Sequence, residues 1–430
     1  MKLTQTTKIN RKDFELPPDK LEVKYGLPRE VKFCVECNIS NQQPMSSNEY
    51  EHTKDSNKNT LEFDEDGICH ACRFNKLKRN EEIDWDEREK ELEELCNKHR
   101  KNDGSYDCLV PGSGGKDSFY AAHVLKYKYG MNPLTVTWAP HLYTDIGFKN
   151  FQEWMHTGGH DNILYTPNGI LHKEMTRNAF LNLLHPFQPF IIGQRIIGPA
   201  MAKKFGVKLV MYGENQAEYG NAIEENSNPI MSMEFFSSEG DEENMLFGGV
   251  KMKEYIESGN YSKDDFAPYI APKKQDILDA GIEVHYLGYY LKWDPQECYY
   301  YAVENTGFQS NPERTEGTYS KYSSIDDKID PFHYYTTLIK FGLGRCSYDA
   351  AQEVRNGKIT REEAEYLVHK YDTEFPEKYF EEFCKYMNIS AEQFWDAIEE
   401  HRSPHIWKKV DNDWKLRHTA SKKGEDDAQQ

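Results

Sequence analysis

The sequence has no long apolar run and is poor in positive charge. No stretch reaches the roughly 18 apolar residues that a membrane-spanning helix needs, and the polar residues 1–10 do not look like a secretory signal. Lysine and arginine number 53 against 72 acidic residues, for a formal net charge of −19. This balance disfavours a large nucleic-acid footprint. We expect a cytoplasmic protein.

The sequence also lacks the dense cysteines of a disulfide-stapled domain, with nine in 430 residues. Four form two C-x-x-C pairs, Cys34/Cys37 and Cys69/Cys72, separated by the 31 residues 38–68. Two such pairs predict a structural zinc site, because zinc prefers four thiolates in a closed tetrahedral arrangement. An iron–sulfur cluster and unmetallated cysteines are the alternatives.

A glycine-rich turn carries the clearest ligand signal. It follows the short apolar segment 106–110 and precedes 119–126, where apolar residues recur at helical spacing. Glycine lets the backbone approach a ligand closely, and a helix N-terminus with a lysine favours an anion. The turn therefore predicts a phosphate cradle, although its spacing is not that of a Walker A loop. The alternative is an ordinary turn with a solvated Lys116–Asp117 pair.

Strand and helix patterns alternate after residue 105. Buried-type strands are predicted at 106–111, 133–138, 162–166, 207–212 and 282–291. Helices are predicted at 118–128, 146–155 and across 170–205, with breaks at Pro186, Pro189 and Pro199. Repeated β-α units predict an α/β fold with a doubly wound parallel sheet. Such sheets bind ligands at the C-terminal ends of their strands, which places 112–118, Trp138 and 213–220 on one rim.

The chain divides into six expected parts. They are a lead-in (1–30), a zinc-ribbon module (31–80), a linking helix (81–104), the α/β domain (105–295), a substrate-binding helical C-terminal region (296–415) and a disordered tail (416–430). Residues 222–280 are polar and irregular, and we interpret them as an insertion or lid. Capping boxes at Thr360–Glu363 and Ser390–Gln393 predict two helix starts near the C-terminus.

Several motifs together resemble one family. The turn from Ser113 to Ser118 is similar to the pyrophosphate loop of the N-type ATP pyrophosphatases, or PP-loop superfamily. With the C-x-x-C pairs and the segments 184–194, 211–221, 299–308 and 316–328, the chain resembles the N-acetyl sugar amidotransferases of bacterial surface-polysaccharide synthesis over about residues 30–400. The resemblance implies a HUP-like PP-loop fold. It also implies conversion of a sugar acetamido group to an acetamidino group with ATP and glutamine-derived ammonia, in lipopolysaccharide, O-antigen or related glycan synthesis.

The chemistry of this conversion suggests the candidate residues. An amide oxygen leaves poorly, so AMP is transferred to it before ammonia adds, and donors and Mg²⁺ must neutralise the phosphates. The candidate catalytic residues are Lys116, Asp117, Glu214 and Lys321. Contacts to ATP are expected from Gly112, Ser113, Gly114, Gly115, Lys116, Asp117, Ser118, Trp138, Gly213 and Asn215. Further cations that can meet phosphate are Arg195, Arg314, Lys328 and Arg345.

Two of these assignments have simpler alternatives. Asp117 either holds magnesium or caps its helix. Glu214 and Asn215 either contact metal or sugar or simply begin a helix.

No glutaminase is recognisable in the sequence. Lys2 stands where an N-terminal nucleophile would follow Met1, and Cys108 and Cys346 have the neighbours of core residues. We therefore expect a separate glutaminase subunit to supply ammonia to a nucleotide-linked N-acetyl sugar. The alternatives are a zinc-containing PP-loop tRNA thiolase and a non-enzymatic zinc scaffold.

Overall fold

A five-stranded sheet forms the centre of the computed structural model, which describes residues 10–45, 49–53, 56–80, 82–214, 216–219, 228–240 and 242–420. The strands are β1 (Cys108–Pro111), β2 (Pro133–Trp138), β3 (Asp161–Tyr165), β4 (Leu209–Tyr212) and β7 (Glu283–Tyr286). Their order is β3-β2-β1-β4-β7, and all adjacent pairs are parallel. The predicted parallel sheet is confirmed, and its order reverses between β1 and β4, where such sheets bind ligands.

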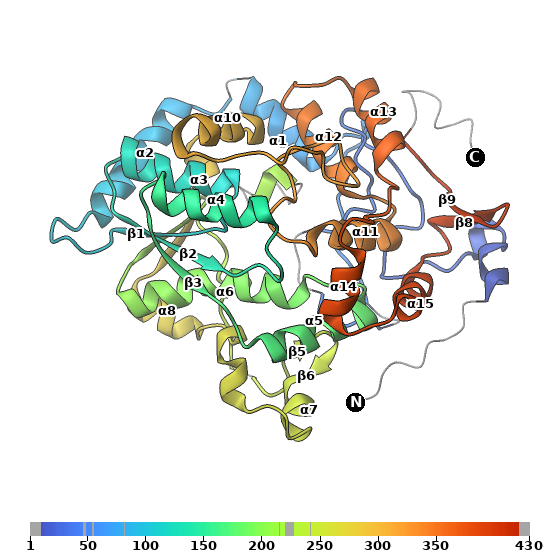
Figure 1. Cartoon of the computed structure of the whole chain (residues 1–430). Helices are drawn as coiled ribbons and strands as arrows, with labels where there is room; N and C mark the ends of the chain where they lie inside the picture. The colour runs from blue at the N-terminus through green and yellow to red at the C-terminus, as the bar shows by residue number, and fades with distance from the viewer. Residues whose placement is uncertain are drawn as a thin grey trace.

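Helices cover both faces of this sheet (Figure 1). One face carries α3 (Lys116–His123), α4 (Asp145–His156) and α10 (Pro295–Thr306), and the other carries α5 (Gly169–Leu183), α6 (Gln188–Phe205) and α8 (Lys274–Ala280). Adjacent residues of the same strand pack on opposite faces of the sheet: Leu109 and Val210 pack with α6, whereas Val110 and Met211 pack with α3. The sheet is therefore doubly wound, as the alternating pattern predicts.

Helix α6 runs unbroken through Pro199, which corrects the predicted interruption. Proline cannot donate to the carbonyl one turn earlier, here that of Arg195. The Tyr212 hydroxyl lies 3.4 Å from this carbonyl and donates to it instead. Pro189 lies in the first turn of α6, where a missing N–H costs nothing, and Pro186 falls between the two helices as predicted.

From residue 330 the C-terminal region is mainly helical up to residue 401. It contains α11 (Asp330–Phe341), α12 (Arg345–Arg355), α13 (Arg361–Tyr371), α14 (Phe380–Met387) and α15 (Ala391–His401). Both predicted capping boxes are present, at the starts of α13 and α15. The chain then forms a hairpin of β8 (Trp407–Val410) and β9 (Asp413–Leu416), which the helical prediction missed. Asp411 and Asn412 both have positive φ, as a tight hairpin turn requires.

The N-terminal module contributes two short 3₁₀ turns (Arg11–Phe14 and Pro18–Lys20), α1 (His70–Arg79) and α2 (Trp85–His99). Between residues 228 and 280, the described residues form a 3₁₀ turn (Met233–Phe235), the β5–β6 hairpin (Leu246–Phe247 and Val250–Lys251), α7 (Met252–Glu257) and a longer 3₁₀ turn (Lys263–Tyr269) before α8. The region predicted as irregular is thus largely folded against α5 and α6.

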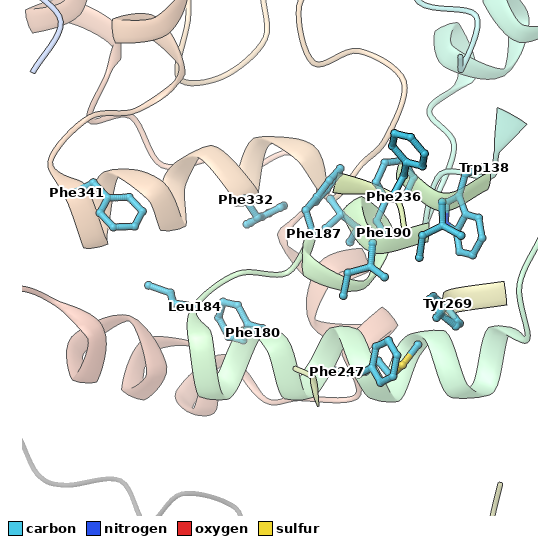
Figure 2. Close-up of a cluster of buried hydrophobic side chains, with 14 of the residues drawn as sticks. Trp138, Phe180, Leu184, Phe187, Phe190, Phe236, Phe247, Tyr269, Phe332 and Phe341 are labelled. Carbon is cyan, nitrogen blue, oxygen red and sulfur yellow. The ribbon is translucent and has the colours of Figure 1, made fainter. Parts of the chain in front are cut away.

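One continuous core joins the sheet domain to the C-terminal helices (Figure 2). It runs from Trp138 and Phe190 near the sheet to Phe332 on α11, whose ring centroid lies 4.1 Å from that of Phe383. Phe180 of α5 stacks on Phe394 of α15 at 5.2 Å. These contacts fix the C-terminal helices beside the ends of the strands.

Candidate active site

The glycine-rich turn takes the form that the sequence predicts. It links β1 to α3, and the Gly112 amide donates to the Val136 carbonyl of the neighbouring strand. A Cβ at Gly112 would lie 2.2 Å from Ser118 Cβ, and one at Gly114, where φ is +85°, would lie 2.9 Å from the Phe151 backbone. No side chain caps the start of α3, so its first amides remain available to an anion.

Lys116 and Asp117 form a pair that is largely shielded from solvent. The Lys116 ammonium lies 2.5 Å from Asp117 Oδ2, and the side chains are 13% and 28% exposed. Burial lowers the pKa of Lys116, but the carboxylates of Asp117 and Glu214 outweigh burial and raise it overall. Lys116 therefore stays protonated. Asp117 Oδ1 is buried without a hydrogen-bond partner, so this oxygen can accept a ligand.

Glu214 follows β4 and faces the same pair. The Tyr219 hydroxyl donates to Glu214 Oε1 over 2.8 Å. Burial and the neighbouring charge of Asp117 raise the pKa of Glu214. A Cβ at Gly213 would lie 2.9 Å from the Trp293 ring, so glycine lets the backbone pack closely against this ring. Asn215 lies outside the described residues.

A cavity of about 720 Å³ opens at the C-terminal ends of the strands. One wall is built from residues 111–118 except Gly114, together with Trp138, Tyr212, Gly213 and Glu214. The opposite wall comes from 320–358, mainly α11 and α12. The predicted rim thus lines one cavity, closed on its far side by the C-terminal region.

Trp138 ends β2 at this cavity. Its ring is 3% exposed and stacks on Tyr165 with centroids 5.5 Å apart. A Cβ at Gly193 would lie 2.3 Å from the Trp138 ring, so the glycine allows α6 to pack closely against it. The indole Nε1 is buried without a hydrogen-bond partner. Trp138 therefore lines the cavity with only a small part of its surface, and its buried indole donor is unpaired.

Asp326 is a cavity residue that the sequence did not single out. Burial together with Asp327 raises the pKa of Asp326, and the nearby Ser113 side chain opposes this shift. The loop after β2 holds this segment: the Thr144 amide donates to the Asp326 carbonyl over 3.2 Å. A Cβ at Gly147 would lie 2.4 Å from Asp326 Cα, so the two segments touch. The segment 316–328 carried the motif signal, but nothing in it distinguished Asp326.

The wall opposite the turn is polar and aromatic. Arg345 Nε donates to Asp349 Oδ1 over 3.0 Å, and its guanidinium carbon lies 4.5 Å from the centroid of the Tyr334 ring. His185 and His333 stack with centroids 5.0 Å apart. Burial lowers the pKa of His333 to about 3 and that of His185 well below its ordinary value, so both imidazoles are neutral near pH 7.

Several predicted cations lie away from the cavity. Lys321 is exposed, and its ammonium donates to the Pro312 carbonyl over 3.0 Å; it does not line the cavity. Arg314 is bound by Glu374, and Lys328 lies 3.6 Å from Glu382. Of the predicted cations, Lys116, Arg195 and Arg345 do reach the cavity. Lys321 was expected at the site because its sequence neighbours carry the motif, but its side chain points outward.

The four paired cysteines meet at one buried point. Their sulfur atoms all lie within 4.8 Å of one another, with Cys34 and Cys72 3.8 Å apart and Cys37 and Cys69 3.7 Å apart. Tetrahedral zinc at about 2.3 Å from each sulfur would space the sulfurs about 3.8 Å apart. The donor set and spacing therefore fit zinc. Within the described residues, this is the one group of potential ligands close enough to hold an ion unaided.

One segment of the chain matches a known protein family. Residues 316–420 match the model of the C-terminal domain of WbpG-like lipopolysaccharide biosynthesis proteins. An uncharacterized protein of Methanocaldococcus jannaschii is 42% identical over 52 residues, which is 12% of this chain and 19% of that relative. The chain thus matches about a fifth of that relative's length. The solved structure of NMN synthetase from Francisella tularensis aligns with 13% identity and a TM-score of 0.30, over 67% of this chain and 94% of that one.

The matched segment supplies the cavity wall that faces the glycine-rich turn, including Asp326, Arg345 and Asp349. The predicted resemblance to a surface-polysaccharide family is therefore confirmed in this part of the chain. Among the described helices, none is both long and apolar enough to cross a membrane.

Proposed function

We propose that this chain, whose residues 316–420 belong to the family of WbpG-like C-terminal domains, is an ATP-dependent amidotransferase of lipopolysaccharide biosynthesis. It converts the N-acetyl group of a nucleotide-linked sugar to an acetamidino group and releases AMP and pyrophosphate. One observation carries the proposal: the phosphate-type turn and the WbpG-like segment line a single cavity, to which Ser113 and Asp326 both contribute.

ATP binds by its phosphates at the turn after β1. The uncapped amides of α3 and the Lys116 ammonium meet the phosphate oxygens, and the glycines admit the phosphates close to the backbone. Mg²⁺, when bound, neutralises phosphate charge, and the unpaired Oδ1 of Asp117 is the oxygen placed to hold it. Trp138 contacts the nucleoside at the same strand ends.

The sugar lies against the wall from the WbpG-like segment. Tyrosine rings with polar tips suit a ring that has apolar faces and many hydroxyls. Those that line this part of the cavity are Tyr322, Tyr334 and Tyr348. In the proposed reaction the acetamido oxygen attacks the α-phosphorus of ATP, and pyrophosphate leaves. The amide carbon then carries AMP as a good leaving group.

Ammonia completes the reaction. It adds to the activated carbon, AMP departs, and a carboxylate takes up a proton from the new nitrogen. Glu214 is suited to this step because its raised pKa makes it a better base than an exposed glutamate. Near neutral pH most free ammonia is protonated, so a separate glutaminase subunit delivers it.

The thiolase alternative receives no support from the cysteines. All nine lie in the described part of the chain, and outside the cluster each one is separate from the cavity lining. Cys108 and Cys346 are both buried with 0% exposure, as the sequence predicts. A sulfur-carrying cysteine at the site is therefore missing.

The nucleotide products test the adenylation step. With ATP, ammonium and candidate N-acetyl sugar nucleotides, chromatography should find AMP and pyrophosphate. ADP and phosphate as main products would exclude this mechanism. Ser113→Ala should lower turnover, because Ser113 belongs to the phosphate-type turn and lines the cavity. Ser105→Ala is the matched control, since Ser105 is exposed and its hydroxyl bonds only Asp103, near the N-terminal end of β1.

The nitrogen source is tested separately. Alone, the chain should use high ammonium salt at alkaline pH and ignore glutamine. With a glutaminase encoded beside it, glutamine should serve at neutral pH. Transfer of glutamine nitrogen by the purified chain alone would contradict the two-subunit arrangement.

A further inference from the structure

Arg355, the last residue of α12, connects the cysteine cluster to the cavity. Its Nη1 lies 3.7 Å from Cys37 Sγ, and its Nη2 donates to the Glu218 carbonyl over 3.0 Å. The side chain is 9% exposed and lines the cavity. A guanidinium presents its donors in a fixed plane, so one side chain can hold both partners at a set separation.

Helix α1 makes a second connection. It begins at the second cysteine pair, where the Cys69 sulfur accepts from the Cys72 amide. Near its end the Lys78 ammonium donates to Glu218 Oε1 over 2.6 Å and to the Trp293 carbonyl over 2.7 Å. Because α1 starts at the cluster, the position of Lys78 depends on the cluster.

A third connection comes from the segment between the cysteine pairs. Gln43 Nε2 donates to the Tyr219 carbonyl over 2.8 Å. The short 3₁₀ turn Gln216–Tyr219 is therefore held by Gln43, Lys78 and Arg355. The Tyr219 hydroxyl in turn bonds the Glu214 carboxylate, which faces Lys116 and Asp117.

We infer that the metal-loaded cysteine cluster positions the active site through Arg355, which sets the backbone of 216–219 and, through Tyr219, the carboxylate of Glu214. Arg355 is a positioning residue, since it acts on Glu214 through other groups. Four thiolates on one divalent ion leave net negative charge beside Cys37, and this charge holds the guanidinium in place. The role given to Glu214 rests on the proposed function, whereas the coupling itself does not.

The test compares zinc-loaded wild type with Arg355→Met. Metal analysis should show about one zinc per chain in both, because the four thiolates remain. Hydrogen exchange of the amides in 209–219 should rise about tenfold in the variant, and pyrophosphate should bind about tenfold more weakly, as expected for a lost charged hydrogen bond. Exchange in β2 should not change. Arg79→Met is the control, since Arg79 is exposed and reaches only the Val354 carbonyl, at 3.5 Å.

A conservative variant keeps the inference testable if Arg355→Met folds poorly. Arg355→Lys retains the charge, but its single ammonium cannot hold both partners, so exchange in 209–219 should fall between wild type and Arg355→Met. Removing zinc from the wild type with a chelator should raise exchange in the same segment.

Two results would overturn the inference. One is unchanged exchange in 209–219 after zinc removal. The other is an Arg355→Met protein that loses zinc yet keeps wild-type exchange in that segment, since the arginine would then serve the cluster alone. If the wild type binds no pyrophosphate, the proposed function fails. Hydrogen exchange of the 209–219 amides still shows whether the cysteine cluster and this segment are coupled.

Discussion

Lys78 and Glu218 form an ion pair whose loss should be costly. Their side chains are 2% and 3% exposed, and the ammonium lies 2.6 Å from the carboxylate. In Lys78→Met the Glu218 carboxylate stays buried without its counter-ion. Breaking a buried pair in this way costs about 3–5 kcal/mol of unfolding free energy. Lys78 also donates to the Trp293 carbonyl, so that acceptor loses its partner too.

Urea unfolding followed by circular dichroism measures this loss. The double variant Lys78→Met/Glu218→Gln should recover part of the stability, because no unpaired charge remains. The control is the exposed pair Lys90–Glu87, whose side chains are 67% and 62% exposed at 3.2 Å. Lys90→Met should cause no measurable change. A loss of unfolding free energy in Lys78→Met no larger than in Lys90→Met would show that the buried pair does not stabilise the fold.

Three further predictions follow from single residues. Cys69→Ser should abolish the stoichiometric zinc that metal analysis finds in the wild type, and retained zinc would rule out the four-thiolate site. Burial raises the pKa of Asp372 from 3.8 to about 6, so the folded chain holds this proton more tightly than the unfolded chain does, and stability falls as pH rises across that interval. Asp372→Asn should therefore flatten the decline in Tm between pH 4 and 6, and an equally steep decline would contradict the assignment. Lys116→Ala should abolish turnover while Lys321→Ala preserves it, because only Lys116 lines the cavity; kcat measurements that show the reverse would restore Lys321 to the site.

Features encoded in short segments could be predicted from the sequence. The glycine-rich turn, the cysteine pairs and the capping boxes each depend on residues a few positions apart, and the structure has all of them. A rule of the same short-range kind, that proline interrupts a helix, gave a wrong prediction at Pro199. The Arg195 carbonyl, which the proline cannot serve as donor, accepts from the hydroxyl of Tyr212, a residue on β4.

The candidate site was predictable on one side only. Alternating strand and helix patterns predict a parallel sheet, and in such a sheet 112–118, Trp138 and 213–214 lie at the same edge because each stands at the C-terminal end of a strand. The facing wall depends on how α11 and α12 dock through the shared core, which no short segment encodes.

Asp326 and Asp327 are two residues whose roles the sequence pattern could not distinguish. They are adjacent acids in one polar loop, and nothing in the sequence separates them. Asp327 accepts hydrogen bonds from the His141 amide at 2.7 Å and the His141 ring at 2.8 Å, whereas Asp326 lines the cavity. The turn, the cysteine cluster and the sheet could be predicted from residues that lie close together in the sequence. The choice between Asp326 and Asp327 could not, because it depends on how the loop after β2 packs against a segment far along the chain.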